Sequence, residues 1–166
     1  MMCVPGPRDT VGGSVNLGPD ELRSIWLGED LQDHAGEVWN RACDALVAGL
    51  PSEARTGDVM LVRAIDFDGR VNNGGLLNRV EEDEGLDEAL EAMRWFGLLE
   101  AATRVEHVRD EWRRLAAEGA PVGAAEQLEQ SADERYFEMP QGQVANQLEA
   151  ALLARLEEDP AAFSPL

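Results

Sequence analysis

Apolar residues recur at three- and four-residue spacing through most of this chain, and this period constrains the fold more than any other feature. The clearest stretch is 98–117, where the apolar positions are Leu98, Ala102, Val105, Val108, Trp112 and Leu115. This spacing places them on one face of an α-helix. The alternation of apolar and polar residues that marks a strand is absent from the sequence. We therefore predict an all-α fold.

Glycine, proline and acidic first turns divide the chain into helices. We predict one compact domain of about seven helices, at 19–27, 30–49, 56–68, 86–96, 98–117, 124–138 and 140–159, with a short helical face at 76–80. Asp68-Gly69 marks a helix break, and Pro160 ends the last helix so that Phe163 folds back onto the core. The apolar stripe of the helix at 30–49 is expected at Val38, Trp39, Ala42, Ala45, Leu46 and Leu50. The domain is expected to span residues 19–166 and to follow a flexible arm, rich in Gly and Pro, at residues 1–18.

The charge balance is strongly acidic. The 166 residues include 33 Asp and Glu against 14 basic residues, all of them Arg, for a net charge of −19. Such a field repels phosphates, so it disfavours direct binding of nucleic acid or of an anionic membrane. Three explanations stay open: solubility or adaptation to high salt, a partner with a basic surface, and a divalent-metal site.

Cysteine usage and hydropathy bear on the compartment. Cys3 and Cys43 are the two cysteines, too few for a disulfide framework, and Cys43 lies in an apolar helical pattern typical of a small core residue. There is no signal-peptide pattern and no apolar run near 18 residues. We expect a cytoplasmic protein.

The acidic character peaks between residues 81 and 91, a stretch without a positive charge. We predict that its seven carboxylates form the partner-binding surface: Glu81, Glu82, Asp83, Glu84, Asp87, Glu88 and Glu91. A corner is expected just before this run, at Asn72, Asn73, Gly74 and Gly75, because glycine permits positive φ and asparagine can adopt it or cap a helix. The arginines of the helix at 98–117 are expected either to face solvent or to pair with the acidic run; they are Arg104, Arg109, Arg113 and Arg114.

No catalytic or metal-binding signature is present in the sequence. Asp66-Phe67-Asp68-Gly69 opens like a calcium loop, but the next ligand position, the turn glycine and the closing glutamate are replaced by Arg70, Val71 and Leu77. His34 and His107 have no second His or Cys at ligand spacing, so His107 is expected to lie at the surface or to form a pair. There is no nucleophile elbow, phosphate loop or dinucleotide fingerprint. We predict that the protein is not an enzyme and holds no metal or cofactor.

The segment Gly69-Arg70-Val71-Asn72-Asn73-Gly74-Gly75-Leu76 resembles the "VNNGGF" signature of the bacterial DNA-mimic protein family, small acidic helical domains of otherwise unknown function. Further similar features follow in order: Trp39, the helix with Ala89-Leu90 and Gly97, Tyr136-Phe137, and finally Pro160 with Phe163. The similarity covers about residues 30–163. This chain departs from the family after the glycines, where Leu76-Leu77-Asn78-Arg79-Val80 replaces an aromatic, Gln and a second aromatic.

The resemblance implies an all-α monomer or homodimer whose carboxylates imitate DNA phosphates. Its partner would be a basic DNA-binding protein such as a transcription regulator. Two alternatives stay open. One is an immunity protein or antitoxin that covers the basic site of a nuclease toxin. The other is a helical enzyme or ligand-binding protein with a pocket near Asn73, which a buried polar cavity at that place would support.

Overall fold

Seven α-helices and one turn of 3₁₀-helix make up the described part of the chain. The computed structural model describes residues 31–119, 121 and 123–165, so the predicted arm and the predicted helix at 19–27 lie outside it. The elements are α2 (Leu31–Ala48), α3 (Thr56–Gly74), α4 (Leu76–Glu82), α5 (Leu86–Trp95), α6 (Leu99–Glu118), α7 (Ala124–Phe137), α8 (Val144–Glu158) and η1 (Pro160–Ala162). No strand occurs among these residues, which confirms the prediction of an all-α fold.

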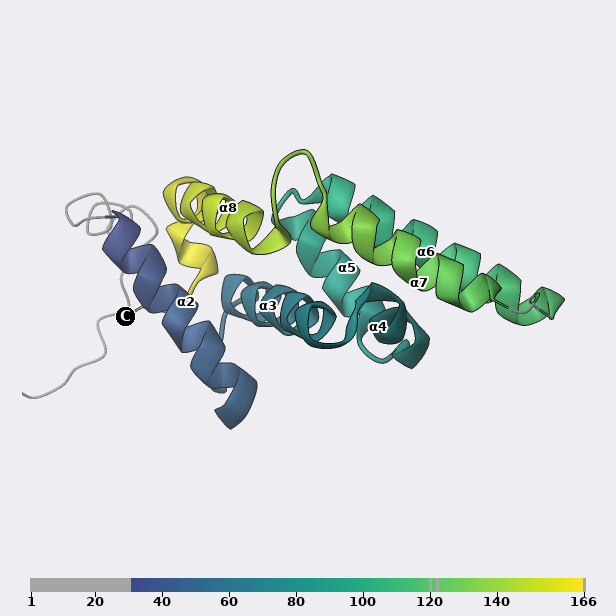
Figure 1. The fold of residues 1–166 in the computed structure, drawn as a ribbon. Coiled ribbons are helices and arrows are strands. Elements are labelled where there is room, and N and C mark those ends of the chain that lie inside the picture. The colour runs from purple at the N-terminus through teal and green to yellow at the C-terminus, as the bar shows by residue number, and fades with distance from the viewer. Residues whose placement is uncertain (1–30, 120, 122, 166) are drawn as a thin grey trace, which may run out of the picture.

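Helix α3 lies at the centre of the arrangement and contacts α2, α4, α5 and α8 (Figure 1). Helices α2 and α8 pack together at one end of the molecule, while α6 and α7 extend side by side toward the other (Figure 1). The pair α6 and α7 is antiparallel: Arg104, near the start of α6, donates to the carbonyl of Arg135, near the end of α7. Helix α4 fills the space between α3 and this pair.

The core is formed by the apolar stripes that the helical period predicts. Its largest side chains with almost no exposed surface include Leu61, Phe67, Leu90, Met93, Tyr136, Leu148, Leu152 and Phe163. Phe163 folds back onto the core, as predicted, and packs edge-on against Trp95 with the ring centroids 6.0 Å apart. A Cβ atom on Gly57 would lie 2.7 Å from the Phe163 ring, so the contact between α3 and the C-terminal segment requires glycine.

The buried carboxylate of Asp58 fixes this C-terminal segment to α3. It accepts hydrogen bonds from the Ser164 hydroxyl at 2.6 Å, the Ser164 N–H at 2.9 Å, the Arg55 N–H at 3.0 Å and Arg41 Nη2 at 2.7 Å. Burial alone would raise the pKa of Asp58, but these hydrogen bonds outweigh burial, and the pKa lies below its ordinary value. Asp58 is therefore charged at neutral pH and joins α2, α3 and the C-terminus.

Three sequence-based expectations about local structure were wrong. Helix α3 does not break at Asp68-Gly69 but continues to Gly74. The last helix begins at Val144 and not near Pro140, because Gly142 adopts a φ of 91° and interrupts the helical backbone. Leu46 and Leu50, placed on the buried stripe of the second predicted helix, are 42% and 40% exposed.

None of the helices in the described residues is long and apolar enough to cross a membrane.

Candidate functional site

A single glycine makes the corner between α3 and α4. Gly75 has φ 83° and ψ 157°, a conformation that is essentially restricted to glycine. Asn72, Asn73 and Gly74 belong to α3, so the predicted four-residue corner is narrowed to Gly75. The two asparagines donate their side-chain amides to the carbonyls of Asp68 and Gly69, at 2.7 and 2.8 Å, instead of capping the next helix.

The cap of α4 comes from α7. Oδ1 of Asp133 accepts the N–H of Leu76, the first residue of α4, at 2.8 Å. A carboxylate at this place satisfies a free backbone donor and lies favourably at the positive end of the helix dipole. A Cβ atom on Gly75 would lie 3.2 Å from the same carboxylate. Gly75 therefore provides both the turn and the space for its cap.

A second polar contact joins α7 to α3 close by. Asp68 accepts a hydrogen bond from the Tyr136 hydroxyl at 2.9 Å and another from the Asn72 amide at 2.9 Å. Burial raises the pKa of Asp68, and these two hydrogen bonds offset only part of that rise. Burial, together with the neighbouring charge and hydrogen bond of Asp68, raises the pKa of Tyr136 well above its ordinary value. Helix α7 is thus held to both sides of the corner.

The seven predicted carboxylates lie on α4, on α5 and in the turn between them, and all seven are exposed. Glu81 and Glu82 end α4, while Asp87, Glu88 and Glu91 lie on α5. In the turn, Asp83 has a φ of 53°, the only positive φ of a non-glycine residue in the described chain, and Gly85 has a φ of 70°. The chain reverses sharply here and brings the two acidic helix ends together.

Arginines pair with four of these seven carboxylates, three of them from other elements and one, Arg79, from α4 itself. The pairs are Glu82 with Arg79 at 3.5 Å, Asp83 with Arg113 at 3.2 Å, Asp87 with Arg109 at 2.9 Å and Glu91 with Arg63 at 3.0 Å. The prediction that arginines of the helix at 98–117 pair with the acidic run is confirmed for Arg109 and Arg113. Arg104 and Arg114 pair instead with glutamates of their own helix, Glu100 and Glu118.

The other three carboxylates of the run, Glu81, Glu84 and Glu88, have no arginine partner among the described residues. They therefore carry most of the uncompensated charge of this segment. The sequence could not separate them from their neighbours, because the pairing arginines lie up to 30 residues away in the chain.

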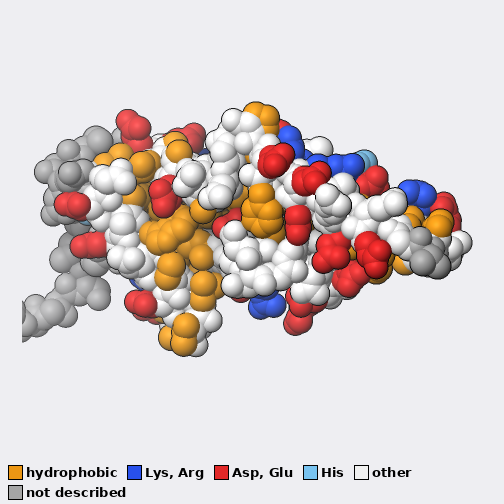
Figure 2. All heavy atoms as spheres, in the orientation of Figure 1, with side chains coloured by type: hydrophobic (Ala, Val, Ile, Leu, Met, Phe, Trp, Pro, Cys, Tyr) orange, Lys and Arg blue, Asp and Glu red, His pale blue; other side chains and the backbone are white. Residues whose placement is uncertain are grey.

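Helix α7 adds carboxylates beside α4. Glu126 and Glu129 lie seven and four residues before Asp133, so the three share one side of α7, and Asp133 marks that side as the one toward α4. Glu126 and Glu129 are exposed and have no arginine partner in the described chain. Acidic side chains gather over the region of α4 and α7 (Figure 2). No local pattern in the sequence distinguishes Glu126 and Glu129, since only the contact through Asp133 brings them near the acidic run.

His107 and Cys43 take no part in this surface. His107 is 58% exposed and lies 3.5 Å from Glu111 one turn later, which confirms a surface histidine that forms a pair. Cys43 is half-buried on α2 with a free thiol. Within the described residues, no group of three or more His, Cys, Asp or Glu side chains is arranged to hold a metal ion.

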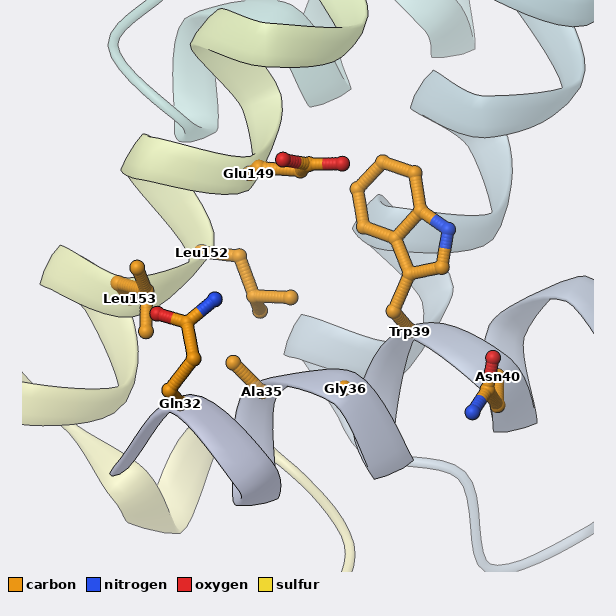
Figure 3. Close-up of a pocket in the computed structure, with 8 residues that line it drawn as sticks. All are labelled: Gln32, Ala35, Gly36, Trp39, Asn40, Glu149, Leu152 and Leu153. Carbon is orange, nitrogen blue, oxygen red and sulfur yellow. The ribbon is translucent and has the colours of Figure 1, made fainter. Parts of the chain in front are cut away.

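Three cavities of ligand size open on the described surface. One, of about 210 Å³, lies between α2 and α8, where Trp39, Leu152 and Leu153 line it together with Gln32 and Glu149 (Figure 3). A second, of about 330 Å³, lies among α3, the α4–α5 turn and α5. The third, of about 220 Å³, lies beside Asn73, but it is open at the surface, whereas the ligand-binding alternative called for a buried polar cavity at this place.

Comparisons of the chain with models of known families, with curated proteins and with solved structures found no match. The resemblance to the DNA-mimic family therefore stays a prediction that rests on the residues quoted above.

Proposed function

We propose that this protein binds the basic surface of a DNA-binding protein, such as a transcription regulator, through carboxylates that take the place of DNA phosphates. The proposed contact residues are the unpaired carboxylates around α4 and α7, which we call the acidic surface: Glu81, Glu84, Glu88, Glu126 and Glu129. The observation that supports it most is that these side chains are exposed and form no ion pair with an arginine of the described chain, whereas their neighbours are paired.

The spacing of charges is suitable for this role. A duplex carries one phosphate about every 3.4 Å along the axis of each strand. Carboxylates one turn apart on a helix lie about 5.4 Å apart along its axis, so two neighbouring helices together approach the charge density of a strand. A basic partner would be steered toward such a surface at low ionic strength, and the attraction would weaken with added salt.

The test begins with the partner. The protein is immobilised, exposed to lysate of its source organism at low salt and eluted with a salt gradient, and the eluted proteins are identified by mass spectrometry. We expect a basic DNA-binding protein that elutes at moderate salt and that the free protein displaces from DNA. Elution of scattered proteins at the lowest salt alone, or failure to compete with DNA, would refute the proposal.

The residues are tested with two triple variants of equal charge change. One neutralises the acidic surface with Glu81→Gln, Glu84→Gln and Glu88→Gln. The control changes Glu37→Gln, Asp44→Asn and Glu157→Gln, three exposed acids on α2 and α8 without an arginine partner in the described chain. At roughly 0.5 kcal/mol per exposed charge, the first should weaken the Kd about tenfold and the control much less. Equal weakening by both variants would show that net charge, and not this surface, governs binding.

A further inference from the structure

Arg79 on α4 is a buried cation whose hydrogen bonds are incomplete. The residue is 3% exposed, and one amino group donates to the main-chain carbonyl of Glu84. Its guanidinium carbon lies 5.8 Å from the centroid of the Phe67 ring. Nη1 is 3.5 Å from a carboxylate oxygen of Glu82, yet neither Nη1 nor Nε has a hydrogen-bond acceptor within the described residues. A buried donor without an acceptor is costly, so this guanidinium calls for an acceptor that the described residues do not supply.

Two cavities adjoin this side chain. Arg70 and Arg79 line both the cavity of about 330 Å³ and the cavity of about 220 Å³ beside Asn73. The larger cavity is also lined by Arg63, Asp66, Glu84 and Glu88. The walls of this space are thus mostly charged, with both signs present.

Pairing within the chain shows which of these charges remain available. Arg70 pairs with Asp66 at 2.9 Å, and Arg63 pairs with Glu91 at 3.0 Å. In the described chain Glu84 and Glu88 form no ion pair within 4 Å, although the charge of Glu84 also acts on Arg70, and Nε and Nη1 of Arg79 have no acceptor. A ligand that pairs with all of these groups must carry a hydrogen-bond acceptor for Arg79 at one end and a cationic donor for Glu84 and Glu88 at the other.

We propose that the cavity among α3, the α4–α5 turn and α5 binds a free amino acid. The carboxylate of the ligand accepts hydrogen bonds from Arg79, and its ammonium group donates to Glu84 and Glu88. A simple anion would be repelled by these two glutamates, and a simple cation would leave the guanidinium unsatisfied, whereas a zwitterion matches both without adding net charge. Arg79 is enclosed, but the neighbouring side chains of Arg70 and Glu82 are 54% and 48% exposed, so entry of the ligand requires only that these two surface side chains change rotamer.

The binding test uses thermal unfolding of the full chain with each of the twenty common L-amino acids at 1 mM. A ligand present at ten times its Kd should raise the Tm by about 3 to 6 °C for a protein of this size. The best ligand is then compared with its N-acetyl derivative, its amide and inorganic phosphate, none of which carries both charged groups. We expect these three to give shifts of less than a third of that size. No shift with any amino acid, or an equal shift with any of the three, would overturn the proposal.

Two glutamates of the same exposed segment provide matched variants. Glu88→Gln removes a carboxylate from the cavity wall, and Glu81→Gln removes one that does not line the cavity. The first should weaken binding of the amino acid at least tenfold by calorimetry, and the second less than twofold; equal effects would overturn the assignment. Arg79→Lys keeps the buried charge but not the planar fork of donors and should also lose at least tenfold, provided that circular dichroism shows the helices intact. Because this site and the acidic surface have separate readouts, the failure of one leaves the other standing.

Discussion

Replacing Gly75 with alanine tests whether the corner between α3 and α4 is held as the structure shows. Alanine at φ 83° and ψ 157° costs about 1 to 3 kcal/mol of backbone strain. Its Cβ would also lie 3.2 Å from the Asp133 carboxylate and push it away from the Leu76 N–H, where a helix cap is worth about 1 kcal/mol. Lower entropy of the unfolded chain returns about 0.4 to 1 kcal/mol. We expect a loss of about 1 to 4 kcal/mol in the free energy of unfolding.

The measurement is urea unfolding followed by circular dichroism, with a corresponding fall in Tm of roughly 2 to 16 °C for a chain of this length. Two other glycines provide controls. Gly69 lies inside α3 with open space around a Cβ atom and no positive φ, so Gly69→Ala should stabilise the protein by about 0.5 to 1 kcal/mol. Gly97 has a φ of 76° and equally open space, so Gly97→Ala reports backbone strain without a collision.

The order of the three variants decides the outcome. If Gly75→Ala costs no more than Gly97→Ala, the contact with Asp133 contributes nothing and the cap from α7 is not formed. If Gly75→Ala raises the free energy of unfolding, as Gly69→Ala is expected to do, the corner itself does not have the described backbone conformation. Either result would refute the account of how α4 is positioned.

Three further predictions concern charged groups in the same fold. Because the folded pKa of Asp58 is lowered, its carboxylate stabilises the protein above pH 3.8, and this contribution is lost as the pH falls through the folded pKa. Asp58→Asn should therefore cost about 2 to 4 kcal/mol at pH 7. In a urea–pH series the cost should be much smaller at the acid end. The pKa of Asp68 is raised, so its charge costs stability above that pKa. Asp68→Asn, whose amide oxygen still accepts from Tyr136, should leave the protein as stable or up to about 1 kcal/mol more stable at pH 7, with the gain absent below pH 3.8; a clear loss would contradict this. A double-mutant cycle on Arg109 and Asp87, the latter 88% exposed, should give a coupling of only about 0.2 to 1 kcal/mol, and a larger value would mean that the pair is shielded from water.

The helices were predictable because the signal that specifies them is local. The apolar stripe of α6 was expected at 98–117 and is observed at Leu99–Glu118. The prediction of a helix break at Asp68-Gly69 was wrong because the helix penalty of glycine is smaller than the gain from tertiary packing. A glycine inside a helix costs about 1 kcal/mol, whereas continuing α3 buries Val71 on the same side as Phe67.

For the candidate site, the sequence predicted which residues are present but not which side chains contact one another. The sequence located the acidic run and the glycine corner, and it anticipated that arginines of α6 pair with the run. It could not assign partners, because Asp133 caps a helix 57 residues earlier and Arg113 reaches Asp83 across 30 residues. Likewise, nothing local distinguishes Arg79 from the exposed arginines; its burial follows from the packing of α4 against α3, α6 and α7.

The internal arginine pairs also bear on why the chain is so acidic. Solubility requires only that charged side chains are exposed. It does not require that the backbone carrying them is held in one position. Here Arg109 and Arg113 of α6 pair with Asp87 and Asp83 on both sides of Glu84 and add a modest restraint to the turn that carries its carboxylate. Carboxylates presented from a fixed backbone lose less conformational entropy when a partner binds. The division of the run into paired and unpaired acids therefore supports the proposal of a binding surface over a purely solvating one, with the proposed contact at the carboxylates that have no arginine partner in the described chain.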